Sequence, residues 1–329
     1  MKVRVCPMPD SLAFNGPATV RRLDPAKFQD PAVTADGSKR ATVALTALET
    51  LWFNTGTLCN IACVNCYIES SPTNDRLAYL TLADVKAKLD EARTEAATLK
   101  EIGFTGGEPF MNPDIIPMLT MALDRGYQVL MLTNAMRPML RSMKPLEALN
   151  TAYPGQLTMR VSLDHYTAEL HEKERGPDSW APAMRGLKFL SNKTFRIDIA
   201  GRLCWGETEA EARLGFAELF NDLQLDLDAD DEFRLVLFPE MDESQDIPEI
   251  TESCWGILDK SPDAVMCGSS RMVVRKNSAD AASVLACTLI PYNVEFDLGE
   301  TLAEASRDVS LNHPHCARFC VLGGASCSG

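Results

Sequence analysis

Six short runs of apolar and β-branched residues recur along the chain, and amphipathic helical patterns separate them. Strands that are buried on both faces read as near-continuous apolar runs, and strands that alternate with helices form parallel βα units. The pattern therefore predicts an α/β fold with six parallel strands, as a closed barrel or an open sheet. The runs are ALTALETLWFN (45–54), EIGF (101–104), YQVLMLT (127–133), QLTMRVSL (156–163), FRIDIAGRL (195–203) and EFRLVLF (232–238).

Local signals mark where the intervening helices begin. Thr81 and Asp84 form a capping box, which predicts a helix over about 82–99. Asn112 followed by Pro113 predicts a second helix that starts at the proline, a residue favoured at the first helical position. Further helical patterns cover about 138–150, 179–191 and 207–221.

The strand–helix alternation stops near residue 240. RMVVR (271–275) and SVLACTLI (283–290), with turn residues between them, predict a β-hairpin. Before residue 45 the periodicity is weak. We therefore expect three segments, an irregular N-terminal stretch over 1–44, a βα domain over 45–240 and a C-terminal domain over 241–329.

Composition narrows the class of protein. The chain has 329 residues, 46% of them hydrophobic and 24% charged, and a formal net charge of −14. Such an acidic chain is unlike a nucleic-acid binder, which gathers basic residues on one face. The sequence shows no apolar run of membrane-spanning length and no secretory signal at its start. We expect a cytoplasmic protein with neither nucleic-acid nor membrane partners.

Three cysteines, Cys59, Cys63 and Cys66, follow the first strand in the spacing CxxxCxxC. Three thiolates can ligate three irons of a [4Fe-4S] cluster and leave the fourth iron open to a substrate or cofactor. Three buried thiols or a zinc site are alternatives. Chance rarely gives this spacing, and zinc sites more often pair CxxC with a second pair downstream.

A second signal, Thr105-Gly-Gly-Glu-Pro109, follows the second strand directly. Gly106 and Gly107 permit close backbone approach and unusual φ values, and the Glu108 carboxylate can accept hydrogen bonds from an ammonium group. Taken alone, the segment could be only a tight turn. Its position about forty residues after the cysteine loop makes a binding role the stronger interpretation.

CxxxCxxC after the first strand and GGEP after the second resemble the radical S-adenosylmethionine (radical SAM) enzymes over roughly 45–240. The resemblance implies a partial (β/α)6 TIM-like barrel in which Cys59, Cys63 and Cys66 hold a [4Fe-4S] cluster. In this family S-adenosylmethionine chelates the open iron, and one electron cleaves it to methionine and a 5′-deoxyadenosyl radical that abstracts a substrate hydrogen. Gly106, Gly107 and Glu108 match the segment that holds the methionyl amine.

Polar residues at other strand ends are further candidates for contacts with S-adenosylmethionine, although a structural role is as common for each. Ser162 and Asp164 match the family's ribose and carboxylate contact region, and Arg175 fits a family position on the following helix. His165 and His171 are more often surface or capping residues. The expected cofactor-binding set is Tyr67, Gly106, Gly107, Glu108, Thr133, Asn134, Ser162, Asp164 and Arg175.

Six cysteines in the last ninety residues resemble the auxiliary-cluster modules called twitch and SPASM. The tail reads CxxxCxxxxxxC, which departs from the seven-cysteine SPASM pattern and favours a twitch-like module with one cluster, expected to be [4Fe-4S]. Two clusters or a zinc knuckle are alternatives. His313 and His315 are candidate neighbours or ligands. The expected ligands are Cys267, Cys287, Cys316 and Cys320, with Cys327 or Cys254 able to replace one of them.

These features predict a radical SAM oxidoreductase or modifying enzyme that acts on a small metabolite or a peptide and receives electrons from a flavodoxin or ferredoxin. Residues 1–44 show no sign of the winged-helix region that many peptide-modifying relatives use to bind a leader. A maturase of a ribosomally made peptide or protein side chain is one alternative. A non-catalytic iron–sulfur electron carrier is a second.

Overall fold

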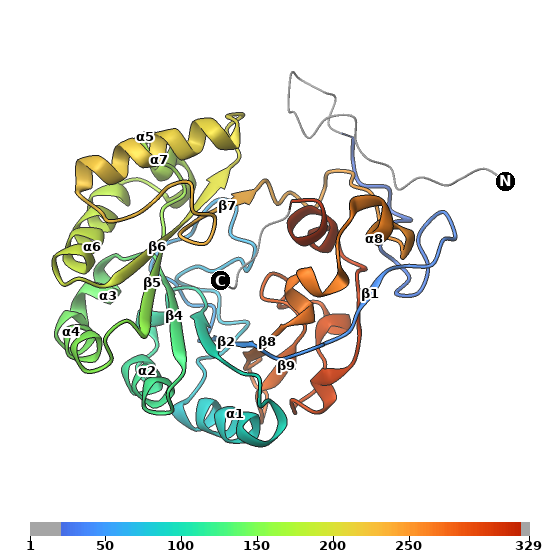
Figure 1. The fold of residues 1–329 in the computed structure, drawn as a ribbon, viewed down its shortest axis with the longest axis horizontal. Coiled ribbons are helices and arrows are strands. Elements are labelled where there is room, and N and C mark those ends of the chain that lie inside the picture. Colours follow the sequence, from blue (N-terminus) through green and yellow to red (C-terminus); the bar gives the residue numbers. More distant parts are fainter. Residues whose placement is uncertain (1–20, 324–329) are drawn as a thin grey trace.

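A computed structural model describes residues 21–323, and its centre is a sheet with the strand order β7-β6-β5-β4-β3-β2-β8-β9 (Figure 1). The six predicted strands lie side by side in parallel from β7 to β2, and β7 does not pair back onto β2 among these residues. The predicted α/β fold, a partial TIM-like barrel, is confirmed. The six strands are β2 (Thr50–Asn54), β3 (Glu101–Thr105), β4 (Gln128–Thr133), β5 (Leu157–Ser162), β6 (Arg196–Leu203) and β7 (Leu235–Pro239).

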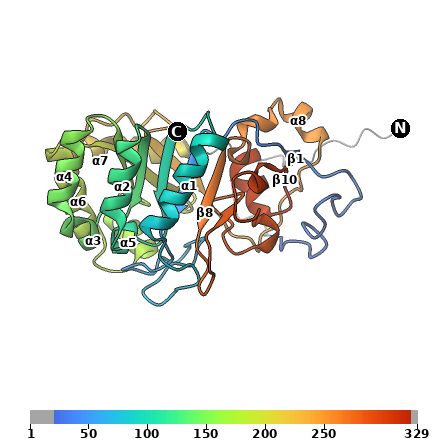
Figure 2. The same ribbon diagram turned by 90° about the horizontal axis from the view of Figure 1, so that it is seen from below.

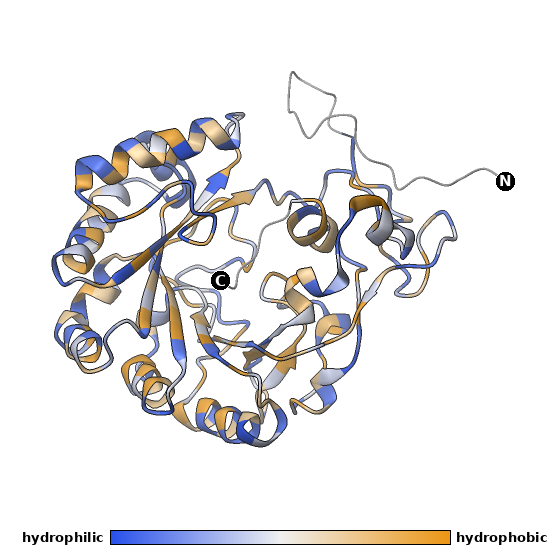
Figure 3. Ribbon diagram, viewed as in Figure 1, coloured by the Kyte–Doolittle hydropathy of each residue, from blue (hydrophilic) through white to orange (hydrophobic). Residues whose placement is uncertain are grey.

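Helices cover the convex side of the curved sheet (Figures 1 and 2). Their apolar faces lie toward the strands and their polar faces lie outward, as Figure 3 shows, because burial of one apolar stripe stabilises a helix on a sheet. The helices are α1 (Leu82–Glu95), α2 (Ile115–Asp124), α3 (Arg137–Arg141), α4 (Met143–Ala152), α5 (Ala168–Arg175), α6 (Trp180–Asn192) and α7 (Glu209–Leu223).

The capping box predicted for α1 is present, with both reciprocal hydrogen bonds between Thr81 and Asp84. The predicted start of α2 is wrong, because the helix begins at Ile115 and not at Pro113. The Asn112 side chain bonds just before that helix, where its Oδ1 accepts from the Asp114 amide at 2.8 Å, and its Nδ2 donates to the carbonyls of Thr55 and Leu80 at 3.1 and 2.9 Å. The local bond thus precedes the helix, and long-range bonds hold the same side chain.

The predicted β-hairpin is present as β8 (Ser270–Val274) and β9 (Ser283–Leu285), which pair antiparallel. Its first strand also pairs parallel with β2, so the barrel sheet continues into the C-terminal segment. We retain 241–329 as a proposed C-terminal module. Its hairpin extends the barrel sheet at the β2 edge.

The segment before β2 is tied to the end of the chain. β1 (Thr42–Val43) pairs antiparallel with β10 (Val309–Ser310), and buried Arg40 forms a 2.6 Å ion pair with Glu249. The N-terminal part of the predicted 1–44 stretch and Cys327 lie outside the described residues. No helix within 21–323 combines the length and the apolar character needed to span a membrane.

A short helix near the end of the described residues lies against β7, the free edge strand of the barrel. After α8 (Ser253–Leu258), a π-helix at Cys316–Val321 packs on β7, where the rings of Phe238 and Phe319 lie 5.0 Å apart. Two distal cysteines therefore lie beside the last barrel strand.

Candidate functional site

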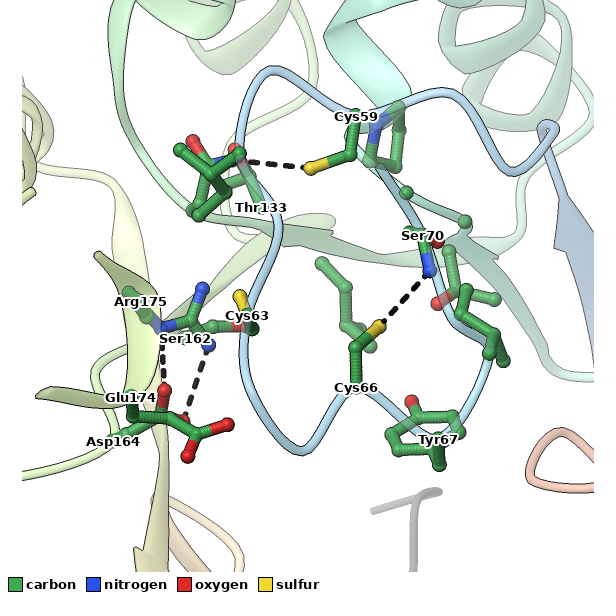
Figure 4. A pocket seen from close by; sticks show the side chains of 18 of the residues that line it. Cys59, Cys63, Cys66, Tyr67, Ser70, Thr133, Ser162, Asp164, Glu174 and Arg175 are labelled. Atoms are coloured by element: carbon green, nitrogen blue, oxygen red, sulfur yellow. Dashed lines mark hydrogen bonds and ion pairs between the residues drawn. The ribbon is translucent and has the colours of Figure 1, made fainter. Parts of the chain in front are cut away.

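A cavity lies where the loop after β2 meets the carboxyl ends of β3, β4 and β5 (Figure 4). Carboxyl ends of barrel strands are where sites of this fold assemble. The three loop cysteines and the predicted S-adenosylmethionine contacts meet here, except Glu108, which is missing from the lining. The lining residues foreseen from the sequence are Cys59, Cys63, Cys66, Tyr67, Gly106, Gly107, Thr133, Asn134, Ser162, Asp164 and Arg175.

The three thiols of the loop face one cavity and form no disulfides. Burial raises the pKa of Cys59 to about 12 and that of Cys63 to about 11. Thiols of this kind ionise when a metal binds, since the thiolate is the ligand. Among residues 21–323 no fourth cysteine lines the cavity. The donor set therefore fits a cubane with one iron left for another ligand.

The GGEP turn packs against the residues that lead into the cysteine loop. The Gly107 amide donates to the Gly56 carbonyl at 2.9 Å, and the Glu108 amide donates to the Leu58 carbonyl at 3.2 Å. A Cβ on Gly107 would lie 2.4 Å from the Leu58 carbonyl oxygen. Glycine is needed here because the two backbones touch.

The Glu108 side chain is 1% exposed and is engaged within the protein. It accepts hydrogen bonds from the Thr133 hydroxyl at 2.9 Å and from the Asn134 and Phe110 amides at 2.8 and 3.2 Å. Burial raises its pKa to about 7, against the lowering effect of these donors. Its carboxylate therefore links the turn to the end of β4.

Asn134 extends this link to the cysteine loop. Its side-chain amide donates to the Asn60 carbonyl oxygen at 2.9 Å and lies 4.0 Å from the Cys59 sulfur. Thr133 and Asn134 thus both line the cavity and hold its walls together.

A buried charge network forms the opposite wall. Arg175, at the end of α5, pairs with Asp164 after β5 through Nε–Oδ2 at 2.6 Å and Nη2–Oδ1 at 3.2 Å. Arg202 of β6 lies 3.8 Å from both Asp164 and Glu174. Two cations and two carboxylates balance here, which reduces the cost of burying each charge.

Sequence reasoning missed several lining residues. Arg202 lies near the end of a predicted strand, and Glu174 directly precedes a predicted site residue, so position gave a weak signal for these two. The other missed residues, which are apolar or small, gave no sequence signal of their own. The full missed set is Ile61, Ile68, Ser70, Thr105, Pro109, Leu132, Glu174 and Arg202.

The distal cysteines divide into two groups. Burial raises the pKa of Cys316 strongly, and the charges of Cys287 and Cys267 add to the effect, so these three thiols interact electrostatically. Cys320 lies on the same π-helix as Cys316. Cys254 lies in the apolar core, where its sulfur accepts from the Thr251 amide at 3.4 Å.

His165 and His171, expected as surface or capping residues, are 2% and 0% exposed, so neither lies at the surface. His165 lies just before α5, where its Nδ1 accepts from the amide of the N-cap residue Thr167 at 3.0 Å. Nε2 of His315 and Nε2 of His313 lie 3.1 and 3.6 Å from a Glu243 oxygen.

Nδ1 of His313 accepts a hydrogen bond from the His315 amide at 3.1 Å, which places the proton of a neutral His313 ring on Nε2. A metal-ligating histidine needs the opposite arrangement, a bare ligating nitrogen and a donor on the other side. This hydrogen bond opposes metal ligation through Nε2 of His313, whereas the ligand atoms of Glu243, His313 and His315 lie within 4.8 Å of one another.

Comparison with known proteins gives a consistent result. Residues 53–211 match the model of the Radical SAM superfamily. The subtilosin biosynthesis protein AlbA of Bacillus subtilis is 31% identical over 143 residues, which are 43% of this chain and 30% of AlbA. An AdoMet-dependent heme synthase of Oleidesulfovibrio alaskensis is 29% identical over 147 residues, 43% of this chain and 34% of that protein.

The matched stretch thus spans about a third of these curated relatives. Among solved structures, Streptococcus suis SuiB bound to S-adenosylmethionine has a TM-score of 0.55 at 13% identity, over 75% of this chain and 62% of SuiB. Fold, cysteine loop and family match agree, and residues 53–211, nearly half of the chain, are similar to the Radical SAM superfamily.

Proposed function

We propose that this protein is a radical SAM enzyme that modifies a small metabolite or a peptide. One observation carries the proposal: three thiols, a glycine turn and the polar ends of β4 and β5 line a single cavity. When bound, the cluster and S-adenosylmethionine supply one-electron cleavage to methionine and a 5′-deoxyadenosyl radical, which takes a substrate hydrogen to give 5′-deoxyadenosine.

The chain's own residues have separate tasks in this proposal. Cys59, Cys63 and Cys66 would hold the cluster, with Tyr67 covering it by packing. The backbone at Gly106 and Gly107 would receive the methionyl amine. The Glu108 carboxylate, which is engaged with the end of β4, orders the turn from outside the cavity.

Ser162 lines the cavity beside the Asp164–Arg175 ion pair. We assign these three residues to the ribose and the methionyl carboxylate. Because Arg175 is already paired with Asp164, its guanidinium is held in a fixed orientation at the cavity wall.

Two kinds of relative bear on the substrate. AlbA is a bacteriocin biosynthesis protein, and the mycofactocin maturase MftC of Mycolicibacterium smegmatis is 31% identical over 137 residues, whereas the heme synthases act on a small molecule. The first two favour peptide maturation as the alternative to a small metabolite. An assay of 5′-deoxyadenosine formation with each substrate class would separate them.

We also propose a second iron–sulfur cluster on the distal cysteines, in a twitch-like module. Supporting it, Cys267, Cys287 and Cys316 interact electrostatically, and Cys320 shares the helix of Cys316. Cys254 is a weaker candidate because it is not among the thiols whose charges act on Cys316. Loss of Cys316 and Cys320 together should lower bound iron from about eight to about four per chain.

The test of the main proposal is reductive turnover after anaerobic reconstitution. We expect 5′-deoxyadenosine from the wild type and none from Cys63→Ala. Cys204→Ala is the control, because its thiol is half-buried and lies outside the cavity lining. Normal turnover by Cys63→Ala would refute the proposal. A cluster whose spectrum does not respond to S-adenosylmethionine would instead favour an electron carrier.

A further inference from the structure

We propose that Glu174 is a positioning residue that fixes the cluster loop, the segment from Cys63 to Cys66, in its metal-binding shape. The proposal rests on the proposed function, since it gives the loop a cluster to hold. Glu174 lies in the last turn of α5 and is 3% exposed. It belongs to a different element from the three cysteines, and it bonds to the two residues that separate Cys63 from Cys66.

Three hydrogen bonds join Glu174 to these two residues. The Asn65 amide donates to Oε1 at 2.9 Å, and the Asn65 side-chain amide donates to Oε2 at 2.8 Å. The Val64 amide donates to the Glu174 backbone carbonyl at 2.8 Å. Both carboxylate oxygens and the carbonyl are thus directed at the loop.

Arg202 completes the arrangement from β6. Its Nη2 donates to the Asn65 carbonyl at 2.6 Å, and its Nη1 lies 3.8 Å from Glu174 Oε1. The backbone N–H and C=O of Asn65 are therefore both bound to buried charged side chains. Bonds to charged partners are the stronger class of hydrogen bond.

Packing alone does not hold this part of the loop. Val64 is 73% exposed, and Asn65 is also exposed. A segment with little buried apolar surface is ordered only if specific bonds offset its conformational entropy, which is about 1–2 kcal/mol per residue for the backbone. Glu174 and Arg202 supply those bonds.

The carboxylate also has an electrostatic cost for the cluster. Its charge is among the causes that raise the pKa of Cys63, after burial. A negative group beside a thiolate site opposes ligation, and its proximity to Arg202 at 3.8 Å offsets part of that cost. The role of Glu174 therefore lies in its two hydrogen bonds to Asn65.

The experiment compares cluster retention in reconstituted protein. Iron release to a chelator is followed for wild type, Glu174→Ala, Glu174→Gln and Asn65→Ala, with exposed Glu169 of the same helix changed to alanine as the control. Two bonds to a charged acceptor are lost in Glu174→Ala, so we expect release to accelerate roughly a hundredfold. Glutamine keeps one acceptor oxygen, and we expect an intermediate rate.

Asn65→Ala keeps the backbone bond and changes only an exposed residue, so it tests the proposal even if Glu174→Ala fails to fold. We expect roughly tenfold faster release from it. The double variant Asn65→Ala with Glu174→Ala should release iron no faster than Glu174→Ala alone, because both changes remove the same contact. We also expect an altered electron paramagnetic resonance spectrum of the reduced cluster in each.

The outcomes separate the two proposals. A wild type that binds a cluster and forms 5′-deoxyadenosine, while Glu174 and Asn65 variants release iron as slowly as Glu169→Ala with unchanged spectra, overturns the positioning role alone. A wild type that binds no cluster at the three cysteines overturns the proposed function and the positioning role with it.

Discussion

Replacing His171 with leucine should stabilise the protein in acid, by an amount that grows as the pH falls. His171 lies in α5, three residues before Glu174, and is 0% exposed. Its ring packs edge-on against Trp180 with 5.4 Å between centroids, and neither ring nitrogen has a hydrogen-bond partner within residues 21–323. The fold therefore accepts this ring only in its neutral form.

Burial and, to a smaller extent, the charge of Arg175 lower the pKa of His171 to about 4. In the unfolded chain histidine titrates near 6.5, so between these values the unfolded state binds more protons than the folded state. Stability due to this group is then lost as the pH falls from 6.5 through 4. The loss amounts to about 3 kcal/mol at pH 4.

Leucine binds no proton, so the variant escapes this loss. Urea unfolding of the apoprotein between pH 8 and pH 4 would measure the difference in unfolding free energy between variant and wild type. Lys173→Met, a change at an exposed position on the same helix, is the control. A His171→Leu difference that stays constant with pH would refute the reasoning, whatever its value at pH 8.

Three further changes test the walls of the site. Gly107→Ala places a Cβ 2.4 Å from the Leu58 carbonyl, so the apoprotein should lose about 1–3 kcal/mol and bind less iron after reconstitution. Tyr292→Phe removes the 2.6 Å bond to the Ile68 carbonyl and should cost about 1 kcal/mol in urea unfolding. Burial raises the pKa of Glu108 to about 7, so the stability that this group contributes to the fold is lost as the pH rises from 4.5 through 7. The unfolding free energy of Glu108→Gln relative to wild type should therefore increase with pH, by about 3 kcal/mol over this range. A pH-independent difference would contradict the last prediction.

The parallel strands could be predicted because burial on both faces leaves a continuous apolar signal that needs no knowledge of partners. Which strands pair with each other could not be predicted in the same way. Nothing local in RMVVR indicates that β8 pairs with β2, since either edge of a sheet offers the same backbone groups. The hairpin was predictable and its place in the sheet was not.

The same distinction applies to the site. Residues at the ends of predicted strands, such as Thr133 and Ser162, could be proposed because parallel strands bring their carboxyl ends together. Glu174 and Arg202 act through Asn65, which lies 109 and 137 residues away in sequence. Only the folded chain brings them together. The start of α2 was misplaced for a related reason, because the Asn112 side chain is also held by the carbonyls of Thr55 and Leu80, which lie far from it in the sequence.

The loop that carries the three cysteines is held from three directions that lie far apart in the sequence. Glu108 of the GGEP turn bonds to Leu58 before the first cysteine, Glu174 bonds between the second and third, and Tyr292 bonds to Ile68 after the third. The loop itself contributes little buried surface in its middle. Its shape therefore depends on β3, α5 and the C-terminal segment being in place together, so the thiols should reach their metal-binding arrangement only after the hairpin has joined β2. A cluster offered to a partly folded chain would meet three thiols without a fixed geometry.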